Sequence, residues 1–360
     1  MLWVDKHRPS NLGKLSHHPE ITQRLQSLAS NPANIPHLLF YGPTGAGKKT
    51  RISSLLRAIY GPGASTLRLD KRSFTTPTKR SIEINMISSN YHIEMSPGDA
   101  GLDDRYVVQD VIKEMAQNKN ITAAAGSGGG DGKKVEYKMV LLVEVDRLSR
   151  QAQAALRRTM EKYAATCRLI LCCNNASKVI EPVRSRCLGI RVPAPTNDEI
   201  CSILQKVARK ENVTLHEELA YKIAQTSHRN LRRALLILEA SYVKNRSLAS
   251  STTVQLTDWE LYIKQLAQDI TREQSPQRLL AAREKLYELL INCVPADVII
   301  KTLALELCEN LDDELKHDVI ESAAFYEHRI ATGSKDIFHL EAFIAKYMAI
   351  YKKYLNEMFG

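Results

Sequence analysis

The sequence lacks any long hydrophobic run. Its 360 residues contain no stretch of about eighteen consecutive apolar residues, the length that a membrane-spanning helix requires. Residues 1–9, with the sequence MLWVDKHRP, also lack the apolar core of a secretion signal. We therefore expect a soluble protein that is not secreted and has no membrane partner.

Cysteine is scarce and follows no metal-binding or disulfide spacing. The seven cysteines are an odd number, and the sequence contains neither a CxxC pair nor a cluster of cysteine and histidine. This pattern argues against a disulfide framework and against a zinc site. We expect reduced thiols, an intracellular protein and no bound structural metal.

The composition that remains is that of a folded protein with a basic surplus. Apolar residues make up 44% and charged residues 25%, and the length exceeds what one core usually supports, so two or three domains are expected. Fifty Lys and Arg against 40 Asp and Glu give a net charge of +10. This surplus favours an anionic partner such as nucleic acid, although solvated basic helix faces would explain it equally well.

Short apolar runs alternate with helical patterns up to residue 192. This alternation predicts a parallel sheet covered by helices. Strands are expected at 36–41, 91–95, 137–145, 168–174 and 188–192, and helices near 48–60, 105–116 and 149–163. Turn signals in residues 61–90 predict a hairpin, and the glycine-rich residues 123–134 predict a flexible surface loop.

The pattern becomes helical after the segment VPAPT at 192–196. Thr196 and Glu199 form the sequence signature of a capping box that begins a helix. Helices are expected near 196–211, 215–226 and 230–242, a linker at 244–253, and amphipathic helices near 257–271, 276–291, 295–310, 314–331 and 336–357. The apolar faces of the last five predict either a self-contained core or assembly with other chains, and we favour assembly.

A phosphate-binding loop follows the first expected strand. Residues 42–50, GPTGAGKKT, stand between that strand and a helical pattern, which is the context that a P-loop requires. Backbone N–H groups of such a loop and the positive end of its helix bind phosphate, and Lys48 would reach the outer phosphates. The candidate nucleotide contacts in this loop are Gly42, Pro43, Thr44, Gly45, Ala46, Gly47, Lys48, Lys49 and Thr50.

The residue after the P-loop lysine departs from the motif. A hydroxyl at this position normally binds Mg²⁺, but the residue is Lys49. Thr50 cannot simply replace it, because one step along a helix turns the side chain by about 100°.

The second acidic ligand of a catalytic Mg²⁺ is missing as well. The Asp that would end the apolar run 139–143 is replaced by Val143, while Glu144, placed to polarise an attacking water, is kept. Two ligands lost from one ion predict a site that binds ATP or ADP with Mg²⁺ weak or absent and with little or no hydrolysis. The alternative is an active ATPase that holds Mg²⁺ through Glu144 or Asp146.

Several motifs occur in the order in which the small subunits of replication factor C, the eukaryotic clamp loader, carry them. They are VDKHRP at 4–9, AQAALRRTME at 152–161, CCN at 172–174, RSRC at 184–187 and NLRRAL at 230–235. The chain resembles these AAA+ subunits over essentially its whole length, and its GAGKKT and EVD segments are most similar to a member regarded as non-hydrolysing. The resemblance implies an α/β AAA+ core at 1–192, an all-α lid at 193–248 and an all-α collar at 249–360.

The resemblance also implies roles for individual residues. Arg186 would be an arginine finger for a neighbouring subunit, Asn174 a sensor of the γ-phosphate, and Arg232 a phosphate contact from the lid. Each has a simpler interpretation, namely a surface arginine, an ordinary turn asparagine and a helix-face ion pair. The candidate contacts on the adenine side are Val4, His7, Arg8 and Ser16, although His7 replaces the usual tyrosine.

The partners that the resemblance implies are the other replication factor C subunits in a heteropentamer, the sliding clamp PCNA and primer-template DNA, in the nucleus. Arg105, Arg147 and Arg150 stand near the starts of helices that would face the DNA backbone, although solvated faces explain them nearly as well. An active AAA+ motor of DNA replication or recombination stays the alternative function.

Overall fold

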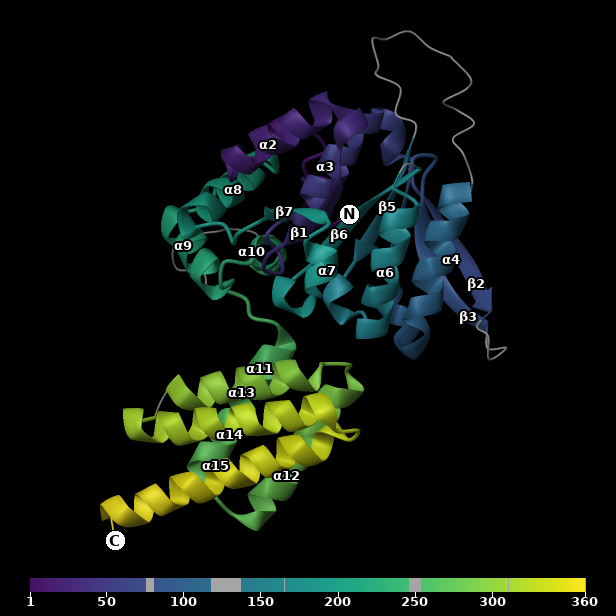
Figure 1. Cartoon of the computed structure of the whole chain (residues 1–360). Coiled ribbons are helices and arrows are strands. Elements are labelled where there is room, and N and C mark those ends of the chain that lie inside the picture. Colours follow the sequence, from purple (N-terminus) through teal and green to yellow (C-terminus); the bar gives the residue numbers. More distant parts are fainter. Residues whose placement is uncertain (76–80, 118–136, 165, 246–253, 310, 360) are drawn as a thin grey trace. The chain divides into compact units, whose positions relative to one another are not determined.

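The structure is a computed structural model that describes residues 1–75, 81–117, 137–164, 166–245, 254–309 and 311–359 (Figure 1). The chain folds into two compact units, Met1–Val254 and Gln255–Gly360. The loop predicted at 123–134 and most of the predicted linker at 244–253 lie outside the described residues. Among the described helices, none combines the length and apolarity that a bilayer crossing requires.

The first unit is built on a mixed sheet. Within the described residues its seven strands follow the order β2-β3-β4-β5-β6-β1-β7. Their bounds are β1 His37–Tyr41, β2 Arg68–Thr75, β3 Ser81–Ser88, β4 His92–Met95, β5 Lys138–Val143, β6 Cys167–Cys173 and β7 Cys187–Arg191. The adjacent strands β4, β5, β6, β1 and β7 are parallel to one another, which confirms the predicted parallel sheet.

The predicted hairpin at 61–90 is confirmed as the antiparallel pair β2 and β3. It is more than an excursion, since β3 also pairs antiparallel with β4 and the hairpin extends the sheet at that edge. The sequence predicted the turn between the strands but not this pairing, because backbone hydrogen bonds between distant segments leave no local pattern.

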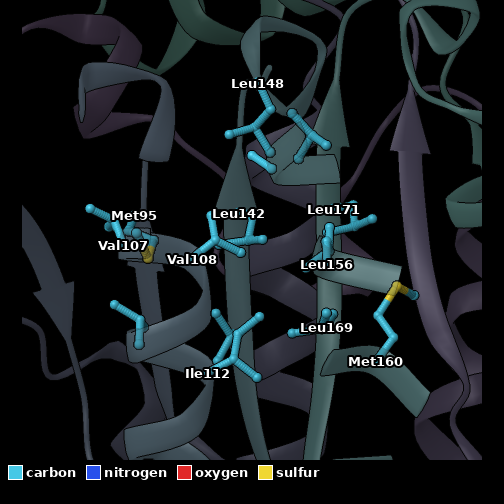
Figure 2. Close-up of a cluster of buried hydrophobic side chains, with 14 of the residues drawn as sticks. Met95, Val107, Val108, Ile112, Leu142, Leu148, Leu156, Met160, Leu169 and Leu171 are labelled. Carbon is cyan, nitrogen blue, oxygen red and sulfur yellow. The ribbon is translucent and has the colours of Figure 1, made fainter. Parts of the chain in front are cut away.

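Helices cover both faces of the parallel strands, because these strands are apolar on both sides. One face packs against α4 (Asp104–Gln117) and α6 (Arg150–Lys162), and Figure 2 shows Ile112 and Leu156 of these helices beside Leu142 and Leu171 of the strands. The other face packs against α2 (Pro19–Ser30) and α3 (Lys48–Tyr60). Each fully buried Leu or Ile here contributes about 1.5–3 kcal/mol.

Short helices connect several of these elements. They are α1 (Trp3–Lys6), α7 (Glu181–Arg184), and the 3-10 helices η1 (Leu12–Lys14), η2 (Pro32–Asn34), η3 (Pro62–Ser65), η4 (Pro97–Asp103), η5 (Val145–Arg147) and η6 (Ala176–Lys178).

Three helices follow the sheet and form the lid: α8 (Asn197–Lys210), α9 (Glu217–Thr226) and α10 (Leu231–Asn245). The predicted capping box is confirmed, since the Glu199 backbone N donates to Thr196 Oγ1 at 3.2 Å and the Thr196 backbone N donates to Glu199 Oε2 at 2.8 Å. Trp3 lies in the core of the lid, and its backbone N donates to Glu239 Oε2 at 3.0 Å. The N-terminal segment is therefore tied to the lid.

The second unit is all-α, as predicted. Its helices are α11 (Asp258–Arg272), α12 (Pro276–Ile291), α13 (Ala296–Glu309), α14 (Asp313–Thr332) and α15 (Asp336–Phe359). Phe343, Ile344 and Tyr347 of α15 are fully or almost fully buried among the other helices. The amphipathic pattern of these segments thus builds a core of its own.

Candidate nucleotide-binding site

The P-loop connects the carboxyl end of β1 to the start of α3. Gly47 precedes α3 with φ +87°, a left-handed conformation that glycine adopts without steric cost. Gly45 is left-handed as well, and a Cβ there would lie 1.8 Å from Asn230 Oδ1 of the lid. Gly42 has a positive φ as well, and a Cβ there would lie 2.0 Å from the Val192 carbonyl oxygen, so glycine is required at three positions of the loop.

The Lys48 ammonium is nearly buried at the start of α3. It donates to the carbonyl oxygens of Gly42 and Pro43 at 2.6 and 2.8 Å and to Asn174 Oδ1 at 2.9 Å. Burial lowers the pKa of Lys48, and the nearby Asp146 carboxylate acts in the opposite direction. Three acceptors therefore fix the ammonium in the loop, and the predicted P-loop lysine and first sensor lie side by side.

Asp146 holds the sensor turn in place. Its Oδ2 accepts from the backbone N–H groups of Asn174 and Asn175 at 3.2 and 3.4 Å. Its Oδ1 is buried and has no hydrogen-bond partner among the described residues. The sequence suggested Asp146 only as an alternative metal ligand, whereas in the structure it positions the turn that carries Asn174, the predicted sensor.

The two positions that would supply Mg²⁺ ligands offer no oxygen atom. The Lys49 ammonium lies 2.7 Å from Glu94 Oε1, and Val143 is buried in the apolar core at the end of β5. Glu144 adopts φ +56°, and its Oε2 accepts from Arg147 Nη1 at 2.9 Å. The donor set at these positions does not fit the ion that a hydrolysing site uses.

The predicted adenine-side residues contact different parts of the structure. Val4 packs on the lid core, and His7 Nε2 lies within hydrogen-bond distance of Glu211 Oε1, just after the end of α8. Arg8 Nε donates to Thr50 Oγ1 of α3 at 3.2 Å, so this residue reaches the P-loop helix. Ser16 is exposed.

His17, the next residue, was not among the predicted contacts, yet it lies against the P-loop. The His17 side chain is 5% exposed, and its Nε2 lies 3.4 Å from the Ala46 carbonyl oxygen. Burial lowers its pKa to about 4, and the Arg51 guanidinium adds to this effect. The imidazole is therefore neutral at physiological pH and can line the loop without adding charge.

Arg51 is a fully buried cation on α3 that sequence reasoning missed. Its Nη2 donates to the His17 carbonyl oxygen at 2.8 Å and its Nη1 to Thr22 Oγ1 at 3.3 Å, while Nε has no partner among the described residues. Burial lowers the pKa of Arg51 to about 10. An arginine in a helical pattern normally faces solvent, so its sequence position gave no signal of this support for the His17 loop.

The second-sensor motif meets the P-loop through Asn230. Asn230 precedes α10, its Oδ1 accepts from the Arg233 backbone N at 3.1 Å, and its side chain lies against Gly45. Arg232, the predicted phosphate contact, is exposed. The structure therefore brings the motif to the loop but places its predicted arginine on the surface of the lid.

Arg186 lies in the turn before β7, at the opposite end of β1 from the P-loop. β7 is parallel to β1, with Cys187 beside His37, whereas the P-loop follows Tyr41. At about 3.3 Å per residue, the length of β1 separates the two features by roughly 13 Å. Arg186 Nε donates to Glu161 Oε1 at 2.7 Å and its Nη1 to the Pro182 carbonyl oxygen at 2.8 Å.

The three arginines predicted to contact DNA gather where α4 and α6 begin. Asp104 Oδ2 accepts from the Ser149 backbone N at 2.7 Å and Oδ1 from Ser149 Oγ at 2.9 Å, which joins the two helix starts. Arg105, Arg147 and Arg150 are exposed beside this junction. Their positions form one basic cluster at two helix N-termini.

Comparison with known proteins covers the whole chain. Residues 259–355 match the replication factor C subunit 3 C-terminal domain, residues 202–243 the RCF1/5-like AAA+ ATPase lid domain, and residues 17–196 the DNA polymerase III delta subunit. Replication factor C subunit 3 of Homo sapiens is 50% identical over 356 residues, covering 99% of this chain and 98% of that protein. Replication factor C subunit 5 of Oryza sativa subsp. japonica is also 50% identical, covering 100% of both chains.

A solved structure, that of a variant of Thermotoga maritima RuvB, resembles the fold. It has a TM-score of 0.50 and 15% identity, and the match covers 84% of this chain and 90% of that one. At this identity the likeness concerns the AAA+ architecture alone, which agrees with the predicted fold class.

Proposed function

Since the chain belongs to the replication factor C family and is a clamp-loader subunit of DNA replication, we propose that it holds a nucleotide without hydrolysing it. We also propose that it contributes a residue to the nucleotide site of a neighbouring subunit. The neighbours are other replication factor C subunits. In the proposed heteropentamer the assembly opens PCNA and loads it onto primer-template DNA in the nucleus. Its relatives are numbered 3 or 5 by species, in agreement with the subunit that its P-loop resembles, the third in humans and the fifth in budding yeast.

Binding of ATP or ADP is supported by the shape and charge of the P-loop. Gly45 and Gly47 adopt the positive φ angles that let the loop turn its backbone N–H groups toward a phosphate, and the N-terminus of α3 adds its partial positive charge. Lys48 and Asn174 meet within hydrogen-bond distance at this point. A phosphate chain bound here would be in reach of both side chains.

Weak or absent hydrolysis is supported by the positions around the missing ligands. Glu144 is kept, but its carboxylate is paired with Arg147, and neither Lys49 nor Val143 provides an oxygen for a metal ion. Metal ions neutralise the charge that develops in phosphoryl transfer, so a site without them loses most of its rate. We propose that Glu144 is a vestige of the catalytic base.

The arginine finger is supported by the single observation that carries this proposal, the position of Arg186 at the far end of β1. An arginine side chain cannot span the roughly 13 Å along the strand to its own P-loop. It lies in an exposed turn before the edge strand β7, where a neighbouring subunit can approach. We propose that Arg186 stabilises charge on the γ-phosphate bound by that neighbour.

Contacts to DNA and to other subunits are assigned to two further surfaces. Arg105, Arg147 and Arg150 would bind the DNA backbone together with the two helix N-termini beside them. The collar, which we place at 249–360, would bind the other subunits through exposed apolar side chains. These include Leu280, Ile291, Leu305, Ile320, Phe325 and Phe338.

The test of the finger is Arg186→Ala in the assembled loader. We expect the rate of hydrolysis at the neighbour's site to fall about a thousandfold, whereas binding of a fluorescent nucleotide to the isolated chain stays unchanged. Arg184→Ala is the matched control, because Arg184 is exposed and ends the preceding turn of α7. Equal losses in the two variants, or loss of nucleotide from this chain, would show that Arg186 is not the finger.

A turnover assay on the isolated chain distinguishes the proposed non-hydrolysing subunit from the alternative, an active ATPase. Mg²⁺-dependent hydrolysis that Lys48→Ala abolishes would favour it. We expect no turnover above that of Lys48→Ala.

A further inference from the structure

Lys49 stands where a catalytic P-loop carries its metal-binding hydroxyl, and the structure gives it a specific partner. Its Nζ lies 2.7 Å from Glu94 Oε1 on β4. The Glu94 side chain is 19% exposed and that of Lys49 47% exposed, so the pair is partly shielded at the edge of the P-loop. This partly exposed ion pair directs the lysine toward β4.

The sheet topology shows where this pair lies. α3 packs on the face that β1, β6 and β5 form, and its second residue, Lys49, reaches Glu94 on β4, the strand next to β5. Ile93 and Met95 point to the α4 and α6 face, so Glu94 points to the α3 face. Val143 and the register partner of Glu94, Leu141, share that face.

The position of Val143 is that of the missing metal-binding Asp. Lys49 is itself one of the two positions that lack a metal ligand, and Glu94 lies on the strand next to the other, Val143. A cation and a carboxylate are already present where a catalytic site would place Mg²⁺ and its acidic ligand.

The electrostatics around Cys172 support this placement. Cys172 lies on β6 beside Val143, and burial raises the pKa of its thiol to about 11. The charges of Lys48 and Lys49 oppose this rise, whereas Asp146 and Glu94 reinforce it. All four charged side chains therefore lie near enough to Cys172, at the carboxyl end of β6, to influence the pKa of its thiol.

We propose that the Lys49 ammonium, tethered by Glu94, replaces Mg²⁺ and that the site takes its nucleotide in the metal-free form. Like a metal ion, an ammonium supplies positive charge to phosphate oxygens, and its three N–H donors allow it to bind Glu94 and phosphate at once. Unlike a metal ion, it is covalently part of the chain. Nucleotide bound this way keeps its phosphates neutralised but lacks the metal that phosphoryl transfer uses.

This inference rests on the proposed nucleotide binding. One titration distinguishes failure of the inference from failure of the proposed function. The dissociation constants of ADP and ATP are measured for the full chain in Mg²⁺ and in EDTA. We expect the values in the two buffers to agree within about twofold. Binding that weakens tenfold or more in EDTA would overturn the inference but not the proposed function, whereas no binding in either buffer would overturn both.

Lys49→Thr tests the ammonium itself. We expect the affinity in EDTA to fall about tenfold or more, because a positive charge facing the phosphates is lost. Lys113→Thr is the control, since Lys113 is an exposed lysine on α4 outside the loop. Unchanged affinity of Lys49→Thr in EDTA would contradict the role of Lys49.

The double variant Lys49→Thr/Val143→Asp restores both lost ligand types. We expect it to bind nucleotide at least tenfold more tightly in Mg²⁺ than in EDTA, unlike the natural chain. Because Val143 is buried, thermal unfolding first establishes whether the double variant folds. If the double variant does not fold, the affinity of Lys49→Thr in EDTA tests the proposal by itself. A folded double variant with the same nucleotide affinity in Mg²⁺ and in EDTA would contradict the placement of the lost metal site at these two residues.

Discussion

The P-loop and the Arg186 turn both present a cation, and they hold it in opposite ways. Lys48 is nearly buried and donates to three acceptors from its own loop and the sensor. Arg186 keeps about a third of its side chain exposed and is held by Glu161, itself half exposed, and by one carbonyl oxygen. The first cation is fixed by the fold, whereas the second is only lightly restrained.

This difference follows from what each residue would lose by moving. Withdrawing Lys48 would break three part-buried hydrogen bonds of a charged donor, and each bond of this kind contributes about 1.5–3 kcal/mol. Releasing Arg186 breaks a surface ion pair worth at most about 1 kcal/mol. The residue that we propose for this chain's own site is thus buried, and the one that we propose for a neighbour's site stays near the solvent.

The largest effect is expected for Lys48→Ala. The variant removes a buried charged donor, and we expect nucleotide affinity to fall by about 4 kcal/mol, close to a thousandfold, in equilibrium binding to the isolated chain. Lys113→Ala should leave the affinity unchanged. A Lys48→Ala chain that still binds nucleotide with the natural affinity would mean that Lys48 is not needed in its own site, and the contrast with Arg186 would fail.

An intermediate effect concerns acid stability at the P-loop. The pKa of folded His17 lies at about 4, below its ordinary value of 6.5, so the folded state favours the neutral form. Its contribution to the free energy of unfolding is complete above pH 6.5 and is lost as the pH falls toward 4, by about 2–3 kcal/mol. His17→Gln should remove this part of the pH dependence, measured by urea unfolding between pH 7 and pH 4.

The charged groups around His17 set the sign of this effect. Arg51 and His18 disfavour its protonation, whereas the Ala46 carbonyl oxygen and the Glu199 carboxylate favour it. Burial also lowers the pKa of His37 and His92, so a residual acid sensitivity remains in the variant. His216→Gln, at an exposed histidine of the same unit, should keep the full slope. Identical slopes in natural chain and His17→Gln would refute the prediction.

The smallest effect is expected for Glu161→Gln. Thermal unfolding of the chain should change by less than about 1 kcal/mol, because the Arg186 pair is a surface pair. Loss of the pair frees Arg186, so the KM for ATP of the assembled loader should fall, by no more than about fivefold. Glu181→Gln, an exposed glutamate in the same region, serves as control. A large loss of stability, or a rise in KM, would contradict the conclusion that Glu161 restrains Arg186 only weakly.

The amino-acid sequence by itself predicted the features that depend on neighbours along the chain. The P-loop, the capping box at Thr196, the parallel strands and the helices of both all-α regions are recognisable because hydrophobic period, turn residues and caps act over a few positions. The departures at Lys49 and Val143 were also visible, because each breaks a motif of fixed spacing.

Only the tertiary structure determined which distant residues meet. The Lys49–Glu94 pair, the His17 and Arg51 support of the P-loop, and the restraint of Arg186 by Glu161 join segments between 25 and 45 residues apart. Arg51 illustrates the reason. Its helical position predicts a solvent-facing cation, but packing of α2 and α3 against the sheet buries it, and burial depends on long-range contacts that no local pattern records.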